Sequence, residues 1–90
     1  MPINSVADFI RALSDGAYAW PGGYPKYFIC DDGEALSFKA AEGMMREISE
    51  AIENRDHSGW RVVGVDINWE DDALFCVHTG ERIPSAYGEA

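Results

Sequence analysis

Apolar residues at helical spacing open the chain. They stand at positions i, i+3, i+4 and i+7, which share one side of a helix, and they are Val6, Phe9, Ile10 and Leu13. Ser5 followed three residues later by Asp8 resembles a capping box, and Asn4 is a rival N-cap. Gly16 is a natural stop signal. The pattern predicts a helix over roughly residues 5–14.

The next segment, residues 17–25, combines aromatic side chains with two prolines and two glycines. Prolines and glycines at this density predict an irregular connection and exclude regular structure. Two interpretations of its aromatic residues stay open. They either tie the loop to the core or form an exposed recognition loop.

A β-hairpin is predicted after this loop. Residues 26–30 have the composition of a strand, and the sequence Asp-Asp-Gly-Glu follows at 31–34. Asp-Gly is a strong signal for a hairpin turn, so residues 35–37 can return as the second strand. Ser37 is then suited to cap a helix that begins near Phe38.

This second helix is predicted to continue to about residue 54. Its apolar stripe consists of Ala41, Met44, Met45, Ile48 and Ile52. Gly43 either weakens the helix by about 1 kcal/mol relative to alanine or marks a close contact. The two methionines are interpreted as core residues, because Met fills irregular gaps in hydrophobic cores.

Two more strands complete the pattern. Residues 60–67 read as the best strand of the chain, because Val63, Val65 and Ile67 alternate toward one face. Residues 73–77 read as a fourth strand, which forms a second hairpin with it. In the tail, Ile83 and Tyr87 are the expected anchors.

The predicted element order is α-β-β-α-β-β. It indicates an α+β fold in which two helices pack on a small antiparallel sheet of two β-hairpins. Ninety residues make one domain, so residues 1–90 are expected to fold as a unit.

Charge changes the picture of function more than any motif does. The chain has 16 Asp and Glu against 7 Lys and Arg, a formal net charge of −9. Nucleic acid and anionic lipid are therefore poor direct partners, whereas a basic protein surface is a good one. The N-terminus lacks the basic and apolar segments of a signal peptide, so a cytoplasmic location with reduced thiols is expected.

Four residues are candidate ligands for a zinc site, namely Cys30, His57, Cys76 and His78. A structural zinc site needs four N or S ligands, usually as two closely spaced pairs, and only Cys76 and His78 form such a pair. We expect two free, part-buried thiols and no metal or other cofactor. A disulfide between the cysteines is disfavoured in a reducing compartment.

Other chemistry finds little support in the sequence. Asp66, Asn68 and Glu70 resemble the start of an EF-hand loop, but Asp71 replaces its glycine and Val77 its final glutamate. No nucleophile motif and no phosphate-binding glycine loop is present. A hydrolase that uses paired carboxylates stays an alternative, although chance pairs are expected in so acidic a chain. We therefore expect a protein that is not an enzyme.

The acidic residues themselves are the candidate partner-binding site. They form one cluster at each of two turns and a row on the second helix, and they are Asp31, Asp32, Glu34, Glu47, Glu50, Glu53, Glu70, Asp71 and Asp72. One interpretation is a solvated surface that provides solubility. The other is a surface that meets Lys and Arg of another protein, with fast, salt-sensitive binding.

Several motifs resemble a family of short, uncharacterised proteins of bacteriophages, prophages and proteobacterial mobile elements. They are the segments AYAWPGGYP at 17–25, WRVVG at 60–64, NWE at 68–70 and CVHTGERIPSAY at 76–87. Some relatives hold C-x-x-C pairs where this chain has residues 37–40 and 76–79, and only Cys76 remains here. The resemblance implies a zinc-ribbon-like ancestor that has lost its metal site.

The resemblance and the charge together give a functional expectation. Phages use small acidic proteins that mimic DNA to block host restriction and CRISPR complexes, and this analogy rests on size, charge and context. We expect a phage-derived inhibitor of a host nucleic-acid-binding defence complex, anti-CRISPR-like in its action. The alternative is a zinc-ribbon-like metal-binding or redox module.

Overall fold

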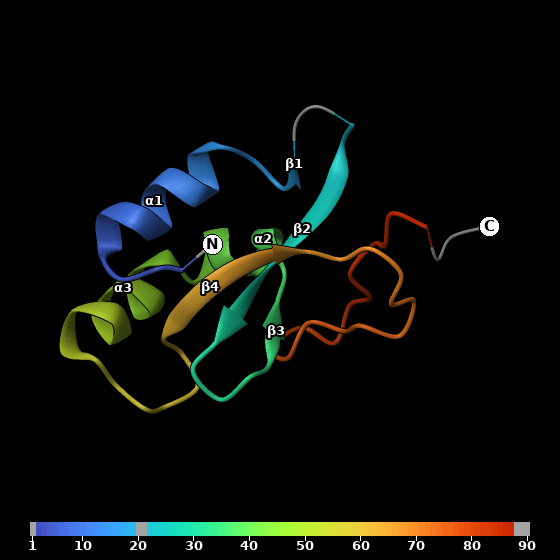
Figure 1. Ribbon diagram of the computed structural model, residues 1–90. Coiled ribbons are helices and arrows are strands. Elements are labelled where there is room, and N and C mark those ends of the chain that lie inside the picture. The colour runs from blue at the N-terminus through green and yellow to red at the C-terminus, as the bar shows by residue number, and fades with distance from the viewer. Residues whose placement is uncertain (1, 20–21, 88–90) are drawn as a thin grey trace.

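The structure, a computed structural model, describes residues 2–19 and 22–87 (Figure 1). In this part of the chain, three helices pack with a four-stranded antiparallel sheet, which confirms the α+β class. The strands are β1 (Tyr18–Ala19), β2 (Tyr24–Cys30), β3 (Ala35–Leu36) and β4 (Val62–Ile67). Strand β2 is the centre of the sheet, because it pairs with each of the other three strands.

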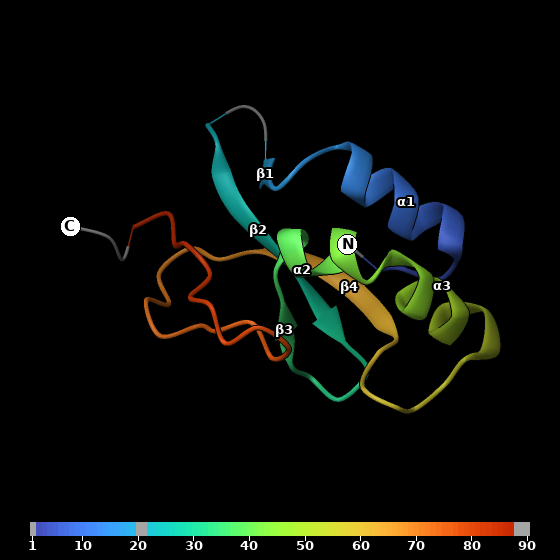
Figure 2. The ribbon, with the colours of Figure 1, turned by 180° about the vertical axis from the view of Figure 1, so that it is seen from behind.

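The helices are α1 (Val6–Ser14), α2 (Phe38–Gly43) and α3 (Met45–Asn54). Figures 1 and 2 show α2 and α3 on one side of the sheet, with α1 beside α3. The segment after β4 has no helix or strand among its described residues, and it forms the loops at the end of the molecule away from α3 (Figure 1).

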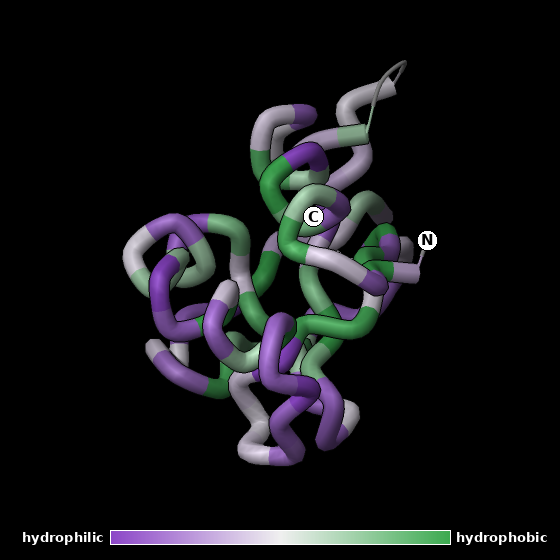
Figure 3. Tube along the Cα trace, turned by 90° about the vertical axis from the view of Figure 1, so that its left-hand side faces the viewer, coloured by the Kyte–Doolittle hydropathy of each residue, from purple (hydrophilic) through white to green (hydrophobic). Residues whose placement is uncertain are grey.

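Phe28 on β2 is the centre of the hydrophobic core. Its sheet neighbours are Val65 on β4 and Leu36 on β3, and all three side chains are buried. The helices contribute Phe9, with its ring centroid 5.3 Å from that of Phe28, and Phe38, stacked on it at 4.2 Å. Figure 3 shows hydrophobic stretches through the middle of the molecule and hydrophilic stretches on the outer loops.

The first helix follows its sequence signals closely. The Ser5 hydroxyl accepts a hydrogen bond from the Asp8 amide at 3.1 Å, and the Asp8 carboxylate accepts one from the Asn4 amide at 3.0 Å. The Ser5 cap confirms the predicted helix start, although the Asp8 carboxylate bonds to the amide before the N-cap and not to the N-cap amide of a strict capping box. The predicted stripe is wrong at Ile10, which is 38% exposed, because the helix turns Phe9 and Ala12 toward the core instead.

The predicted single helix over 38–54 is wrong, because the chain breaks it at Met44. The Ser37 hydroxyl caps α2 as expected, accepting from the Ala40 amide at 3.1 Å. Gly43 ends α2, and Met44 has φ −118° and ψ 23°, outside the helical region. A Cβ at Gly43 would meet nothing within 4 Å, so this glycine weakens the helix and does not mark a close contact.

The predicted pairing of the strands also needs two corrections. Residues 18–19 and 24–25 pair as the β1–β2 hairpin, so the segment 17–25 is not irregular throughout, although Trp20 and Pro21 lie outside the described residues. Proline has no N–H, and the pairing at Pro25 needs none. The bond at this position is donated by the Asn68 amide to the Pro25 carbonyl at 2.9 Å.

The second correction concerns β4 and residues 73–77. Strand β4 pairs with β2, so it forms no hairpin with the segment that follows. Residues 73–77 are not a strand and make one isolated bridge, between Phe75 and Arg82. Their backbone instead pairs with residues 81–83 and with Ala35, through the bonds Cys76 N–H to Glu81 O, Ile83 N–H to Leu74 O and Val77 N–H to Ala35 O.

Within the described ranges, no helix has the length and apolar character needed to cross a membrane.

Candidate interaction sites

The turn between β2 and β3 holds the first acidic cluster. Asp32 and Glu34 are exposed and Asp31 is half-buried. The Asp32 carboxylate accepts a hydrogen bond from the Glu34 amide at 3.0 Å, and Gly33 has φ +84°, which glycine adopts without strain. Asp32 therefore has a structural role in the predicted turn. The Glu34 carboxylate accepts none of the described hydrogen bonds.

The second cluster is the row on α3. Glu47, Glu50 and Glu53 are all exposed, because Ile48, Ala51 and Ile52 form the buried side of the helix. Arg46 Nε lies 3.5 Å from Glu50 Oε1, and both side chains are largely in solvent. Such an exposed pair contributes at most about 1 kcal/mol to stability. Arg46 reduces the negative charge of the row, and the row stays negative overall.

The third cluster, Glu70, Asp71 and Asp72, follows β4 and is exposed. The buried Asn68 side chain organises this turn. Its amide nitrogen donates to the carbonyls of Asp71, Ile83 and Pro84 at 2.9, 3.3 and 3.0 Å, and its oxygen accepts from the Asp71 amide at 3.1 Å. The Asp71 carboxylate accepts from the Ala73 amide at 2.9 Å, so this residue, like Asp32, holds a turn.

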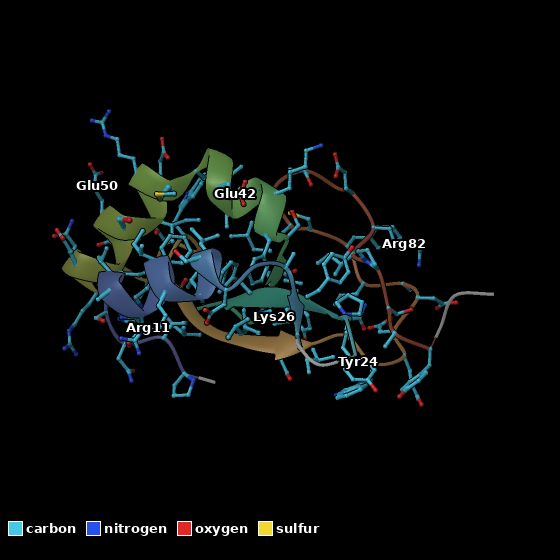
Figure 4. The ribbon with its side chains drawn as sticks, turned by 90° about the horizontal axis from the view of Figure 1, so that it is seen from above. Arg11, Tyr24, Lys26, Glu42, Glu50 and Arg82 are labelled. Carbon is cyan, nitrogen blue, oxygen red and sulfur yellow. The ribbon has the colours of Figure 1, made fainter. Side chains whose placement is uncertain are left out.

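The structure does not bring the three clusters together. At one end of the β2–β4 pair, the Asn68 amide bonds to the Pro25 carbonyl. At the other end, the Asp31 amide bonds to the Arg61 carbonyl. At about 3.3 Å per strand residue, these two points are roughly 20 Å apart. The α3 row lies on the helix side of the molecule, where Figure 4 labels Glu50. The nine predicted site residues therefore lie in three separate places.

Cys30 and Cys76 are free, and both are buried where the sequence suggested part-buried thiols. Burial, followed by the charges of Asp32 and Asp31, raises the pKa of Cys30 to about 12. Burial also opposes ionisation of Cys76, but hydrogen bonds from Ser37 and Thr79 outweigh it and lower the pKa of that thiol to about 7. The Ser37 amide donates to Cys76 Sγ at 3.4 Å.

The four candidate zinc ligands do not gather into a site. His57 is exposed in the loop before β4, and the His78 ring stacks on Trp60 with centroids 4.2 Å apart. Among residues 2–19 and 22–87, no group of three or more His, Cys, Asp or Glu side chains could hold a metal ion. The arrangement gives no support to the metal-binding alternative.

An aromatic cluster that was not predicted lies at the same end as the third acidic cluster. We call Tyr24, Trp69 and Tyr87 the aromatic platform. The ring centroids of Tyr24 and Trp69 are 4.7 Å apart, those of Tyr24 and Tyr87 6.3 Å, and those of Trp69 and Tyr87 6.0 Å. Tyr87 was expected to anchor the tail, yet it is 63% exposed, whereas Ile83 is buried as expected.

The sequence contained only part of the signal for this platform. One interpretation of the aromatic residues at 17–25 is an exposed recognition loop, and Tyr24 belongs to this segment. Trp69 and Tyr87 come from segments far away in the chain, which the β2–β4 pairing and the C-terminal segment bring beside it.

Comparison with known proteins adds no relative: no protein-family model, curated protein or solved structure matches this chain.

Proposed function

We propose that the chain is a small, non-enzymatic interaction protein that binds a basic surface of a nucleic-acid-binding protein complex. The observation that supports this most is the excess of exposed carboxylates. Sixteen Asp and Glu stand against seven Lys and Arg, so many carboxylates stay without a cation even if every cation were paired. Apart from the half-buried Asp31, the residues of the three acidic clusters are exposed to solvent, where a partner can reach them.

The class of partner follows from this charge. Proteins that hold nucleic acid present Lys and Arg to its phosphates, and carboxylates can neutralise the same cations. Opposite charges accelerate encounter and make binding sensitive to salt. In its specific form, the proposal is a phage-derived inhibitor that keeps a host defence complex from its DNA or RNA, in the manner of an anti-CRISPR. Support for that form is the resemblance to phage proteins, together with size and charge.

The positions of the clusters limit how the protein would bind. The molecule measures 41 × 25 × 20 Å, and its acidic clusters lie at the two ends of the β2–β4 pair and on α3. The two turn clusters are roughly 20 Å apart along the β2–β4 pair, so a basic patch smaller than this contacts one of them at a time. The proposal is therefore contact through one cluster and its surroundings, and it does not need one continuous strip of carboxylates that copies a duplex strand.

A capture experiment with matched charge variants tests the proposal. The first variant combines Glu34→Gln, Glu70→Gln and Asp72→Asn, and it spares Asp32 and Asp71 because their carboxylates hold turn amides. The second removes three charges from the helices through Glu42→Gln, Glu47→Gln and Glu53→Gln. Each immobilised protein is exposed to nuclease-treated bacterial lysate at low salt, and bound proteins are eluted with salt and identified.

We expect wild type to retain basic nucleic-acid-binding proteins and one of the two variants to lose them. Loss of binding by the first variant assigns the contact to the two turn clusters, and loss by the second assigns it to the helices. Wild type that retains no such protein at low salt, or variants that both retain it undiminished, would contradict the proposal.

A further inference from the structure

The aromatic platform presents large rings to solvent together with carboxylates. Trp69 is 43% exposed and Tyr87 63% exposed, and Tyr18, on the neighbouring strand β1, is 55% exposed. A small domain gains by burying such rings, so an exposed group of them at one place marks an interaction surface. Trp and Tyr are also the residues that contribute most to binding energy at protein interfaces.

Backbone pairing holds the platform in place. The Asn68 amide bonds to Pro25 O at 2.9 Å, which places Trp69 next to Tyr24. The Tyr87 amide bonds to Trp69 O and the Ala86 amide to Asn68 O, both at 2.8 Å, which places Tyr87 beside Trp69. The Tyr24 side chain, through hydrogen bonding more than charge, raises the pKa of Tyr87. The three rings are thus positioned before any partner arrives.

Gly22 leaves room for the Tyr24 ring. A Cβ at this position would lie 2.7 Å from an atom of that ring, and Gly22 has φ +108°, which other residues rarely adopt. A shallow hollow of about 280 Å³ adjoins the ring, between Tyr18 and Tyr24 on one side and residues 84–86 on the other. The surface therefore combines flat rings with a concave border.

Glu70 adjoins these rings, and Asp66 and Asp71 lie near Tyr27 on the strand that carries Tyr24. Glu70 follows Trp69 directly in the chain, and its charge acts on the Tyr87 hydroxyl. The charges of Asp66 and Asp71 act on Tyr27, which is the β2 residue paired with Asp66. Lys26 is the β2 cation nearest in sequence to Tyr24. Its ammonium group lies 5.3 Å from the ring centroid of Phe38 on α2. The platform thus offers π-faces and negative charge to a ligand of positive charge.

We propose that this platform binds an arginine side chain of the basic partner. A guanidinium group is planar, stacks on aromatic faces and pairs with carboxylates, so it satisfies both features of the surface at once. A lysine ammonium group is more strongly hydrated and lacks the planar face, and it is expected to bind less well. This assignment rests on the proposed function, and it selects one of the three acidic clusters as the contact.

Titration with short peptides tests the assignment without knowledge of the partner. The probe is an acetylated and amidated peptide in which three arginines alternate with glycines. Its controls carry lysine, or neutral citrulline, in place of arginine. Binding is followed through backbone amide and indole N–H signals in two-dimensional NMR at low salt, and these spectra also report whether each variant is folded.

Five variants make the test specific. Trp69→Ala and Tyr87→Ala each remove one platform ring, and Phe75→Ala removes a ring of 52% exposure that makes none of the described contacts with the platform. Glu70→Gln removes the platform charge, and Glu53→Gln removes one charge from α3 as its control. We expect Trp69→Ala and Tyr87→Ala each to weaken binding of the arginine peptide by about 3- to 30-fold, which is the range of one cation–π contact. The control variants should stay within about twofold, and citrulline should abolish binding.

The outcomes separate this assignment from the proposed function. If the arginine peptide binds equally well to wild type, Trp69→Ala and Tyr87→Ala, or loses affinity only with Glu53→Gln, the platform assignment is wrong and the proposed function stands. Equal binding of the citrulline peptide also overturns the assignment. A chain that binds no arginine peptide and retains no basic protein from lysate would overturn both.

Discussion

Asn68 illustrates how one side chain positions a surface built from distant segments. It is a buried polar residue, 3% exposed, and its amide group satisfies three carbonyls and one backbone amide. These bonds hold the acidic turn after β4 and the segment at 83–84 in fixed positions. Because buried polar groups are costly when unpaired, we expect the order of this end to depend on the Asn68 side chain.

Replacing Asn68 by aspartate should destabilise the fold in a manner that depends on pH. The new carboxylate would face three carbonyls that now accept hydrogen bonds, so we expect a loss of about 3 kcal/mol or more at pH 7. Those carbonyls would hold the carboxyl pKa above its ordinary value. Stability is then highest below the unfolded pKa of about 3.9 and is lost as pH rises through the folded pKa.

Urea denaturation at pH 4 and pH 7 measures this effect. Asn54→Asp makes the same chemical change at an exposed position at the end of α3, and it should alter stability by no more than about 0.5 kcal/mol. Equal stability of the Asn68 and Asn54 variants at pH 7 would mean that the amide network contributes little.

Cys76 provides a second test at the scale of a residue. Its pKa is about 7 in the folded protein, against an ordinary value of 9.0. A lowered pKa contributes stability that is fully present above the unfolded value and is lost as pH falls through the folded value. Wild type should therefore gain about 1–2 kcal/mol between pH 7 and pH 9 relative to Cys76→Ala. Urea titrations of both proteins with reductant present provide the difference, and parallel pH profiles would contradict the assigned hydrogen bonds.

At the scale of elements, local signals predicted what local interactions decide. The cap of α1, the Asp-Gly turn after β2 and the Ser37 cap of α2 all formed as expected, because each depends on residues within three or four positions. Pairing between distant segments was harder to predict. Strand β1 was missed because proline and glycine surround it, and residues 73–77 were misassigned because their strand composition gave no information about the partner.

The same distinction applies to the candidate site. Exposure of the acidic residues follows from their type and could be predicted. Their separation into three places could not, since it depends on which strand ends meet. The aromatic platform was missed for the same reason, because Tyr24, Trp69 and Tyr87 are 18 or more positions apart and only the pairings at Asn68 and Trp69 bring them together.

The break between α2 and α3 gives a prediction for an element. Gly43 is exposed, has room for a Cβ and does not have positive φ. Gly43→Ala should therefore stabilise the protein by about 0.5–1 kcal/mol through helix propensity. Gly80→Ala is the matched control, because Gly80 also has open space but has φ +73°, so the same change should destabilise. Thermal unfolding of both variants checks the signs, and a destabilised Gly43→Ala would mean that the break itself requires glycine.

At the scale of the whole molecule, charge and arrangement have different consequences. The net charge of −9 makes direct binding to nucleic acid or anionic membranes unfavourable. The arrangement in three clusters argues against one continuous acidic strip and favours contact at one end. The end that carries Trp69 and Glu70 combines charge with exposed rings, which makes it the surface best suited to a basic partner.

The central claim is that the chain and nucleic acid compete for the same basic surface. The measurement that tests it most directly is fluorescence anisotropy of a labelled duplex bound to the basic protein retained by the chain, as purified chain is added at low salt. We predict that anisotropy falls to the value of free duplex, and that the chain with Glu34→Gln, Glu70→Gln and Asp72→Asn displaces less duplex at equal concentration. Anisotropy that stays constant or rises, as it would if the chain bound beside the duplex, would contradict the account.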